Sequence, residues 1–500
     1  MKRYCSVYCL ALALTFAEAA CAEVTYSKGK DGELDVVRMT VTPAAEPVPA
    51  LRYRLMPRDI DLQPGNAAPY YYRAMIDLSS TISSLRKKYG EEFEDWYETD
   101  IIPLSKLPLD KVRVANEKLD FIVRGQLKVA NNRRNCDWEL GIDQIRGVDI
   151  ISFLLPEFQE CRQLARVLVL RARMAVAERR YDDAIESIRM TYRLGRDAAQ
   201  PFLVCGLIGI AIDGMADRAL VELIANPGSP NMYWALGELP EPPIDLRSTV
   251  RFEMGFGARM FPLINNAETT DHSPQEWNRL LTESIHNLQD VGGTGIPGPH
   301  GKTANDVESG FAATMVGLSG YSHAKEQLIA QGMDRSRVEK MAVGQVIAIY
   351  TERTYRRFAD DWENLWQVPF ARSIEMARRL DKKMEEARPL GAGEDREILP
   401  LATLLLPALQ ASRGAQVRLA REVASIRVVE ALRIYAAEHG GQLPKRLEDI
   451  DKVPVPINPA TEKPFEYRLD GATAILELPT SDGLDSGNCR YEIQIAAKQQ

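Results

Sequence analysis

Oxygen-bearing side chains near the C-terminus are the first candidates for ligand chemistry in this 500-residue chain. Asp482, Asp485 and Asn488 follow one another at intervals of three residues around two glycines, in a stretch that the sequence predicts to be a loop. Such oxygens are the ligands that Ca²⁺ prefers, although the ion usually takes about six to eight of them. Two interpretations stay open, a calcium site and an ordinary acidic turn, and the turn is the simpler one.

Histidine and phosphate chemistry have few residues to draw on. A hydrolase of the serine–histidine or zinc type would need its imidazoles from a set of five histidines, which are His272, His286, His300, His323 and His439. Pairs such as His286 with Asp290 could share a helix face, yet two ligands do not make a metal site. The segment 295–303 resembles a phosphate-binding loop but carries Ile296 where the pattern requires glycine. No cofactor is expected apart from the possible calcium ion.

Four cysteines follow the first 22 residues, and their spacing matches no zinc motif. Cys205 lies in the apolar run 202–212, so we expect it to be a small buried side chain. Cys136 and Cys161 are the one pair that we would test for a disulfide in an oxidising compartment.

The first 22 residues predict export. Lys2 and Arg3 precede an apolar stretch at 7–17, and Ala20 and Ala22 provide a small-residue cleavage site before Glu23. This order of segments is typical of a secretory signal. We therefore expect a signal peptide at 1–22 and a periplasmic or secreted protein. The longest later apolar run, 398–409, contains two prolines and is too short to cross a membrane, so no stable membrane span is expected after cleavage.

The composition indicates a globular protein without affinity for nucleic acid. Hydrophobic residues make up 45% of the chain, which allows more than one core. The formal net charge is −8, and no basic stripe with interleaved aromatic residues offsets it. Such a surface repels phosphate backbones.

The elements that must position these residues are mainly helices. We expect an extended segment at 23–62 with a strand near 36–42, and then a helical domain at 63–226. Within that domain, the turn at 177–185 resembles that of a tetratricopeptide hairpin, in which a bulky aromatic residue is followed by a small alanine. No second copy occurs at a period of about 34 residues. The prediction is therefore packed helical hairpins that are tetratricopeptide-like in part.

The second half of the chain predicts three further regions. Prolines and glycines indicate an irregular region with short helices at 227–302, and a helical segment packing on the first should follow at 303–390. Residues 396–500 should form a helix and a small antiparallel sheet, with a hairpin around Asp470-Gly471. An aromatic stripe lies in the helical segment and consists of Tyr355, Phe358, Trp362, Leu365 and Trp366. We predict that these side chains belong to the core, and the alternative is that they form a groove for a ligand.

Several stretches resemble an uncharacterised family of exported, mostly helical proteins common in planctomycete bacteria. They span most of the mature chain, at 64–73, 136–138, 168–177, 230–236, 342–346 and 355–357. The resemblance implies export and a helical architecture and assigns no reaction. The C-terminal part is loosely similar to the head of a type II secretion pseudopilin, on the segments 404–409, 431–444, 458–459 and 463–467. Pseudopilins often bind calcium in the loop after their sheet.

The sequence favours an exported, non-catalytic scaffold or interaction protein with a protein partner. Abundant helix pairs, the aromatic stripe and the lack of a coherent catalytic set support this hypothesis. A hydrolase that uses carboxylates or a histidine is the first alternative, and perturbed titratable groups in one deep pocket would favour it. A component of envelope or secretion assembly is the second.

Overall fold

The structure is a computed structural model of the chain. It describes residues 24–29, 34–142, 156–290, 306–389, 393, 395–479 and 489–496. The predicted signal at 1–22, the segment 295–303 and the loop with Asp482, Asp485 and Asn488 lie outside the described residues.

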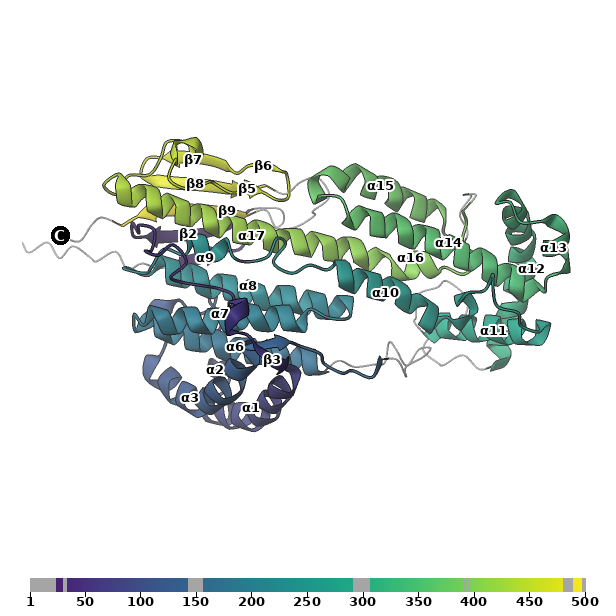
Figure 1. Cartoon of the computed structure of the whole chain (residues 1–500), viewed down its shortest axis with the longest axis horizontal. Coiled ribbons are helices and arrows are strands. Elements are labelled where there is room, and N and C mark those ends of the chain that lie inside the picture. Colours follow the sequence, from purple (N-terminus) through teal and green to yellow (C-terminus); the bar gives the residue numbers. More distant parts are fainter. Residues whose placement is uncertain are drawn as a thin grey trace, which may run out of the picture.

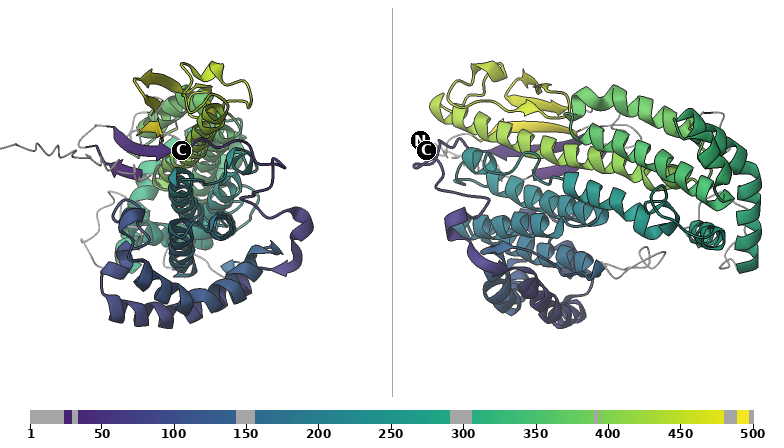
Figure 2. Two further views of the ribbon diagram at one scale, coloured as in Figure 1. Left: turned by 90° about the vertical axis from the view of Figure 1, so that its left-hand side faces the viewer. Right: turned by 45° about the vertical axis from the view of Figure 1, so that its right-hand side comes forward.

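The molecule is mainly helical and is organised around one long helix, α17 (Pro407–Glu438), which runs along much of its length (Figure 1). A layer of three helices lies beneath α17, and a further group of helices covers the far side of that layer (Figure 2). A small sheet lies at one end of α17, and α11 (Pro274–Asp290), α12 (Asp306–Ala330) and α13 (Arg335–Lys340) form the opposite end of the molecule.

The middle layer consists of α6 (Pro156–Ala177), α7 (Tyr181–Ala198) and α8 (Leu203–Ala225). Short turns join them, so each helix packs along its neighbour, as the apolar periodicity predicts. Their outer cover comprises α1 (Ala68–Tyr89), α2 (Glu92–Asp95), α3 (Leu109–Ile122) and α4 (Lys128–Asn131). The last two belong to one continuous stretch, since a π-helical turn at Val123–Leu127 links them.

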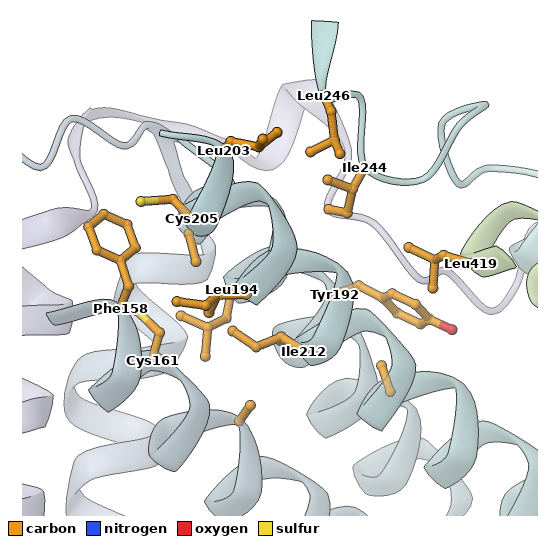
Figure 3. Close-up of a cluster of buried hydrophobic side chains, with 14 of the residues drawn as sticks. Phe158, Cys161, Tyr192, Leu194, Leu203, Cys205, Ile212, Ile244, Leu246 and Leu419 are labelled. Atoms are coloured by element: carbon orange, nitrogen blue, oxygen red, sulfur yellow. The ribbon is translucent and has the colours of Figure 1, made fainter. Parts of the chain in front are cut away.

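Side chains from these three helices form much of the core. Figure 3 shows Phe158 and Cys161 of α6 close to Cys205 and Ile212 of α8, with Leu194 of α7 between them. Cys161 and Cys205 are fully buried, so the expected packing role of Cys205 is confirmed. Leu419 of α17 also belongs to this cluster, which joins the long helix to the middle layer.

The remaining helices extend the body beside α17. They are α9 (Tyr233–Leu236), α10 (Arg247–Met260), α14 (Val343–Trp366), α15 (Phe370–Glu386) and α16 (Leu401–Leu405). The aromatic stripe lies on α14, and each of its five side chains is at most 7% exposed. Its prediction as core is therefore confirmed.

The sheet differs from the expected one. Its strand order is β1-β2-β9-β8-β7, with the bounds β1 (Val24–Ser27), β2 (Asp35–Val41), β7 (Glu466–Asp470), β8 (Thr473–Leu478) and β9 (Cys489–Ile495). The hairpin of β7 and β8 is confirmed, although its two-residue loop is Gly471-Ala472. An antiparallel C-terminal sheet was expected, but β2 pairs with β9 in parallel, so the sheet is mixed and both ends of the chain build it. Two short ladders complete the strands, β3 (Gln63–Asn66) with β4 (Arg133–Asn135) and β5 (Ile457–Asn458) with β6 (Lys463–Pro464).

Candidate interaction groove

An open groove of about 720 Å³ lies against one face of α17. Four segments that are distant in sequence line it: residues 236–247, the junction of α14 and α15 at 366–370, residues 413–427 of α17, and residues 455–462. Ligand sites commonly have volumes of about 300–1,000 Å³. The groove is therefore large enough for several side chains of a partner.

The floor of the groove is apolar. Val417 of α17 and Ala460 form a small buried cluster, separate from the main core, with Phe370 packed against it. Trp366, the last residue of the aromatic stripe, also lines the groove. The stripe thus serves as core along most of α14, while its final member borders the groove.

Prolines form much of the wall. Six of them line the groove: Pro240, Pro242, Pro243, Pro369, Pro456 and Pro459. Proline has a fixed φ angle and no backbone N–H, so these segments lose little conformational entropy on binding. A wall of this kind is preformed.

Arg413 places a positive charge in the floor of the groove. Its side chain comes from α17, and its Nη2 donates to the carbonyl of Val368 at 2.7 Å. The guanidinium lies 5.3 Å from the centroid of the Phe370 ring and 6.0 Å from that of Trp366, within the range of cation–π attraction. Burial lowers the pKa of Arg413 to about 10. No carboxylate among the described residues forms an ion pair with it.

Arg427 provides a second cation about four helical turns further along α17. Its guanidinium lies 4.5 Å from the centroid of the Tyr233 ring. Its Nε is buried and has no hydrogen-bond partner within the described part of the chain. A buried donor without a partner costs free energy, which an acceptor from a ligand would recover.

The carboxylates around the groove are mostly engaged elsewhere. Glu462 pairs with Arg372 at 2.6 Å, and Asp245 pairs with Arg247 at 2.7 Å. Glu241 lies exposed at the rim. The floor therefore combines apolar surface with two cations that lack carboxylate partners in the described structure.

The residues that the sequence singled out do not meet at this groove. Cys136 and Cys161 are both thiols in the structure, and burial raises the pKa of each above its ordinary range. A negative charge on Cys161 would raise the pKa of Cys136 further. A disulfide between them stays a prediction, which intact mass with and without reduction would test. The calcium prediction for Asp482, Asp485 and Asn488 also stays untested, because these residues are outside the described structure.

The histidines with described positions lie apart from one another. His286 Nδ1 lies 3.3 Å from the hydroxyl of Ser309, which is buried. His323 bonds to the Tyr350 hydroxyl at 3.0 Å, and the ring of His439 stacks on that of Tyr435. No group of three or more His, Cys, Asp or Glu side chains among the described residues could hold a metal ion.

Comparisons with known proteins give no assignment. Neither protein-family models, nor curated proteins, nor solved structures match this chain. Within the described residues, no helix combines the length and the apolar character needed to cross a membrane.

The sequence offered two partial signals for the groove. One is the proline cluster at 240–243, which appears in the sequence only as a break in regular structure. The other is the spacing of arginines along the C-terminal helix. Neither signal shows that these segments share one groove, because residues 236–247 and 413–427 meet only through the tertiary fold.

Proposed function

We propose that this protein is an exported interaction protein, and that its groove binds an extended segment of a partner protein carrying both apolar and acidic side chains. The observation that supports this function is the pairing of an apolar, proline-walled floor with Arg413 and Arg427. Apolar partner residues would cover Val417 and Phe370, and carboxylates would complement the two guanidinium groups. The tetratricopeptide-like hairpins and the family resemblance remain hypotheses that agree with this function.

A binding assay with designed peptides tests the proposal. The probes are fluorescent, capped octapeptides of alternating leucine and aspartate, with leucine–lysine and leucine–asparagine peptides of equal length as comparisons. We expect anisotropy titrations on the mature chain, residues 23–500, to give the tightest binding for the leucine–aspartate peptide. Equal affinity for the acidic and basic peptides would contradict the charge argument.

Two substitutions on α17 separate groove binding from non-specific binding. Ala420 lines the groove, so Ala420→Phe should fill it and weaken binding by at least about tenfold, or ~1.4 kcal/mol. Ala411 is exposed on the same helix and does not line the groove, so Ala411→Phe should bind as the wild type does. Arg427→Gln should weaken binding of the leucine–aspartate peptide more than binding of the leucine–asparagine peptide. If Ala420→Phe binds as well as Ala411→Phe, the groove is not the site.

A further inference from the structure

A second cavity lies where the sheet meets the helical body, and we name it the junction cavity. It has a volume of about 450 Å³, and residues of β1, β2, α8, α17 and the start of β9 line it. Its polar lining includes Tyr26, Asp217, Arg418, Glu422 and Cys489. Segments from both ends of the chain thus converge on one small cavity.

Asp217 is the least explained residue of this lining. Its side chain is only 1% exposed, and Oδ1 accepts a hydrogen bond from the Tyr192 hydroxyl at 2.5 Å. Oδ2 is buried and has no hydrogen-bond partner among the described residues. Native structures rarely leave buried polar atoms unpaired, so Oδ2 points to an absent partner.

Burial disfavours the charged form of two acids of the cavity, Asp217 and Glu422. Burial raises the pKa of Asp217 well above its ordinary range. Burial also raises the pKa of Glu422, which accepts a hydrogen bond from the Tyr491 hydroxyl. A neutral carboxyl group can both donate and accept a hydrogen bond. A hydroxyl group of a ligand can also donate and accept a hydrogen bond, so it could bond to Oδ2 of Asp217.

Arg418 is the cation of the cavity that is open to an anionic ligand. Lys28 and Arg218 both lie near Asp100, at 3.5 and 3.8 Å, and share its charge. Arg418 also lines the cavity and is partly buried, and no carboxylate within the described residues forms an ion pair with it. A carboxylate of a ligand would supply that missing partner.

Nucleophilic catalysis does not fit the same groups. A reactive cysteine needs a lowered pKa. Burial instead raises the pKa of Cys489 to about 12, so the thiol stays protonated at neutral pH.

We propose that the junction cavity binds a small hydroxylated carboxylate, whose carboxylate pairs with Arg418 and one of whose hydroxyl groups bonds to Asp217. A guanidinium forms charge-assisted hydrogen bonds with a carboxylate, and the low exposure of Asp217 strengthens the bond to a hydroxyl. The volume suits a ligand of the size of a sugar acid.

Thermal shift and calorimetry on the mature chain test this site. The probes are gluconate and glucuronate. Glucose is the control that lacks a carboxylate, and propionate is the control that lacks hydroxyl groups. We expect a saturable rise in Tm with at least one of the sugar acids and no rise with glucose or propionate at the same concentration. An equal response to glucose, or no response to either sugar acid, would overturn the proposal.

Variants link the binding to the named residues. Arg418→Gln should weaken binding at least about tenfold, while Arg379→Gln, an exposed residue of α15, should leave it unchanged. Asp217→Asn keeps a neutral group of the same shape and should retain most of the affinity, whereas Asp217→Leu should lose it. If Asp217→Leu does not fold, the comparison of Arg418→Gln with Arg379→Gln still tests the proposal. Unchanged affinity for the sugar acid in Arg418→Gln would contradict it. Ala420→Phe should not affect this binding, so the outcome is independent of the peptide groove.

Discussion

Glu430 and Arg433 lie one turn apart on α17 and form an ion pair of 2.9 Å in which neither side chain is exposed. Arg433 also donates to the carbonyls of Thr42 and Ser229, each at 2.9 Å. Glu430 accepts from the backbone N–H of Met232 at 2.9 Å. The pair therefore attaches the N-terminal segment and the 229–232 loop to the long helix.

Removal of one member of this pair should be strongly destabilising. Glu430→Gln leaves the guanidinium of Arg433 buried without its counter-charge, which costs about 3–5 kcal/mol of the free energy of unfolding. Urea unfolding followed by circular dichroism measures the loss. Arg279→Gln is the control, because Arg279 and Glu276 form an exposed pair, which water screens and which contributes little to stability. Similar losses in both variants would show that burial of the first pair has no special effect.

Stability should fall with rising pH because of Asp213 and Asp217. Both lie on α8, each is at most 2% exposed, and burial raises the pKa of each well above its ordinary range. The folded protein then keeps protons that the unfolded chain loses above a pH of about 4, so the free energy of unfolding decreases from there upward. Asp213→Asn should flatten this slope and raise the free energy of unfolding at pH 8 above that of the wild type. Urea midpoints between pH 5 and 9 test this, and an unchanged slope would refute it.

Glu397 should titrate near neutral pH. It is 2% exposed, its carboxylate accepts from the backbone N–H groups of Ala402 and Thr403, and burial raises its pKa to about 7. The folded state binds a proton that the unfolded state has released, so stability decreases between about pH 4.5 and 7 and levels off above that. The decrease amounts to about 3 kcal/mol at 1.36 kcal/mol per pKa unit. Glu397→Gln should remove this component, which NMR titration of the carboxyl carbon would locate independently.

Glycines on α8 should respond in opposite directions to the same substitution. A Cβ atom at Gly209 would lie 2.6 Å from the carbonyl oxygen of Gly195 on α7, so Gly209→Ala should cost about 1–3 kcal/mol through overpacking. At Gly214 no atom lies within 4 Å of the added Cβ, so Gly214→Ala should stabilise the helix by up to about 1 kcal/mol. Thermal unfolding of both variants measures the contrast. Stabilisation by Gly209→Ala would contradict the close approach of α7 and α8.

Local pattern was sufficient to predict much of the secondary structure. Residues 489–495 alternate in the way that strands require, and residues 474–478 follow the hairpin signal Asp470-Gly471; both segments form strands of the sheet. The helical domain expected at 63–226 contains the helices of the middle layer. The helix expected within 396–500 begins at Pro407, because proline is tolerated in a first helical turn.

The candidate groove was much less predictable than the helices around it. The sequence gives no sign that Arg413 and Trp366 share a site. Arg413 belongs to a helix with many charged residues, and Trp366 belongs to the aromatic stripe that is predicted to be core. Their approach to within 6.0 Å depends on how α14, α15 and α17 pack. Sequence spacing contains no information on that packing.

The sequence by itself determined the helical character of the protein, its hairpin and the burial of its aromatic stripe, because these depend on periodicity within a few turns. Only the tertiary structure decided that residues 35–41 pair in parallel with residues 489–495, and that Arg433 and Glu430 are buried together. Strand pairing between the two ends of the chain depends on long-range burial. The same charged residue is solvated or buried according to which distant segment covers it.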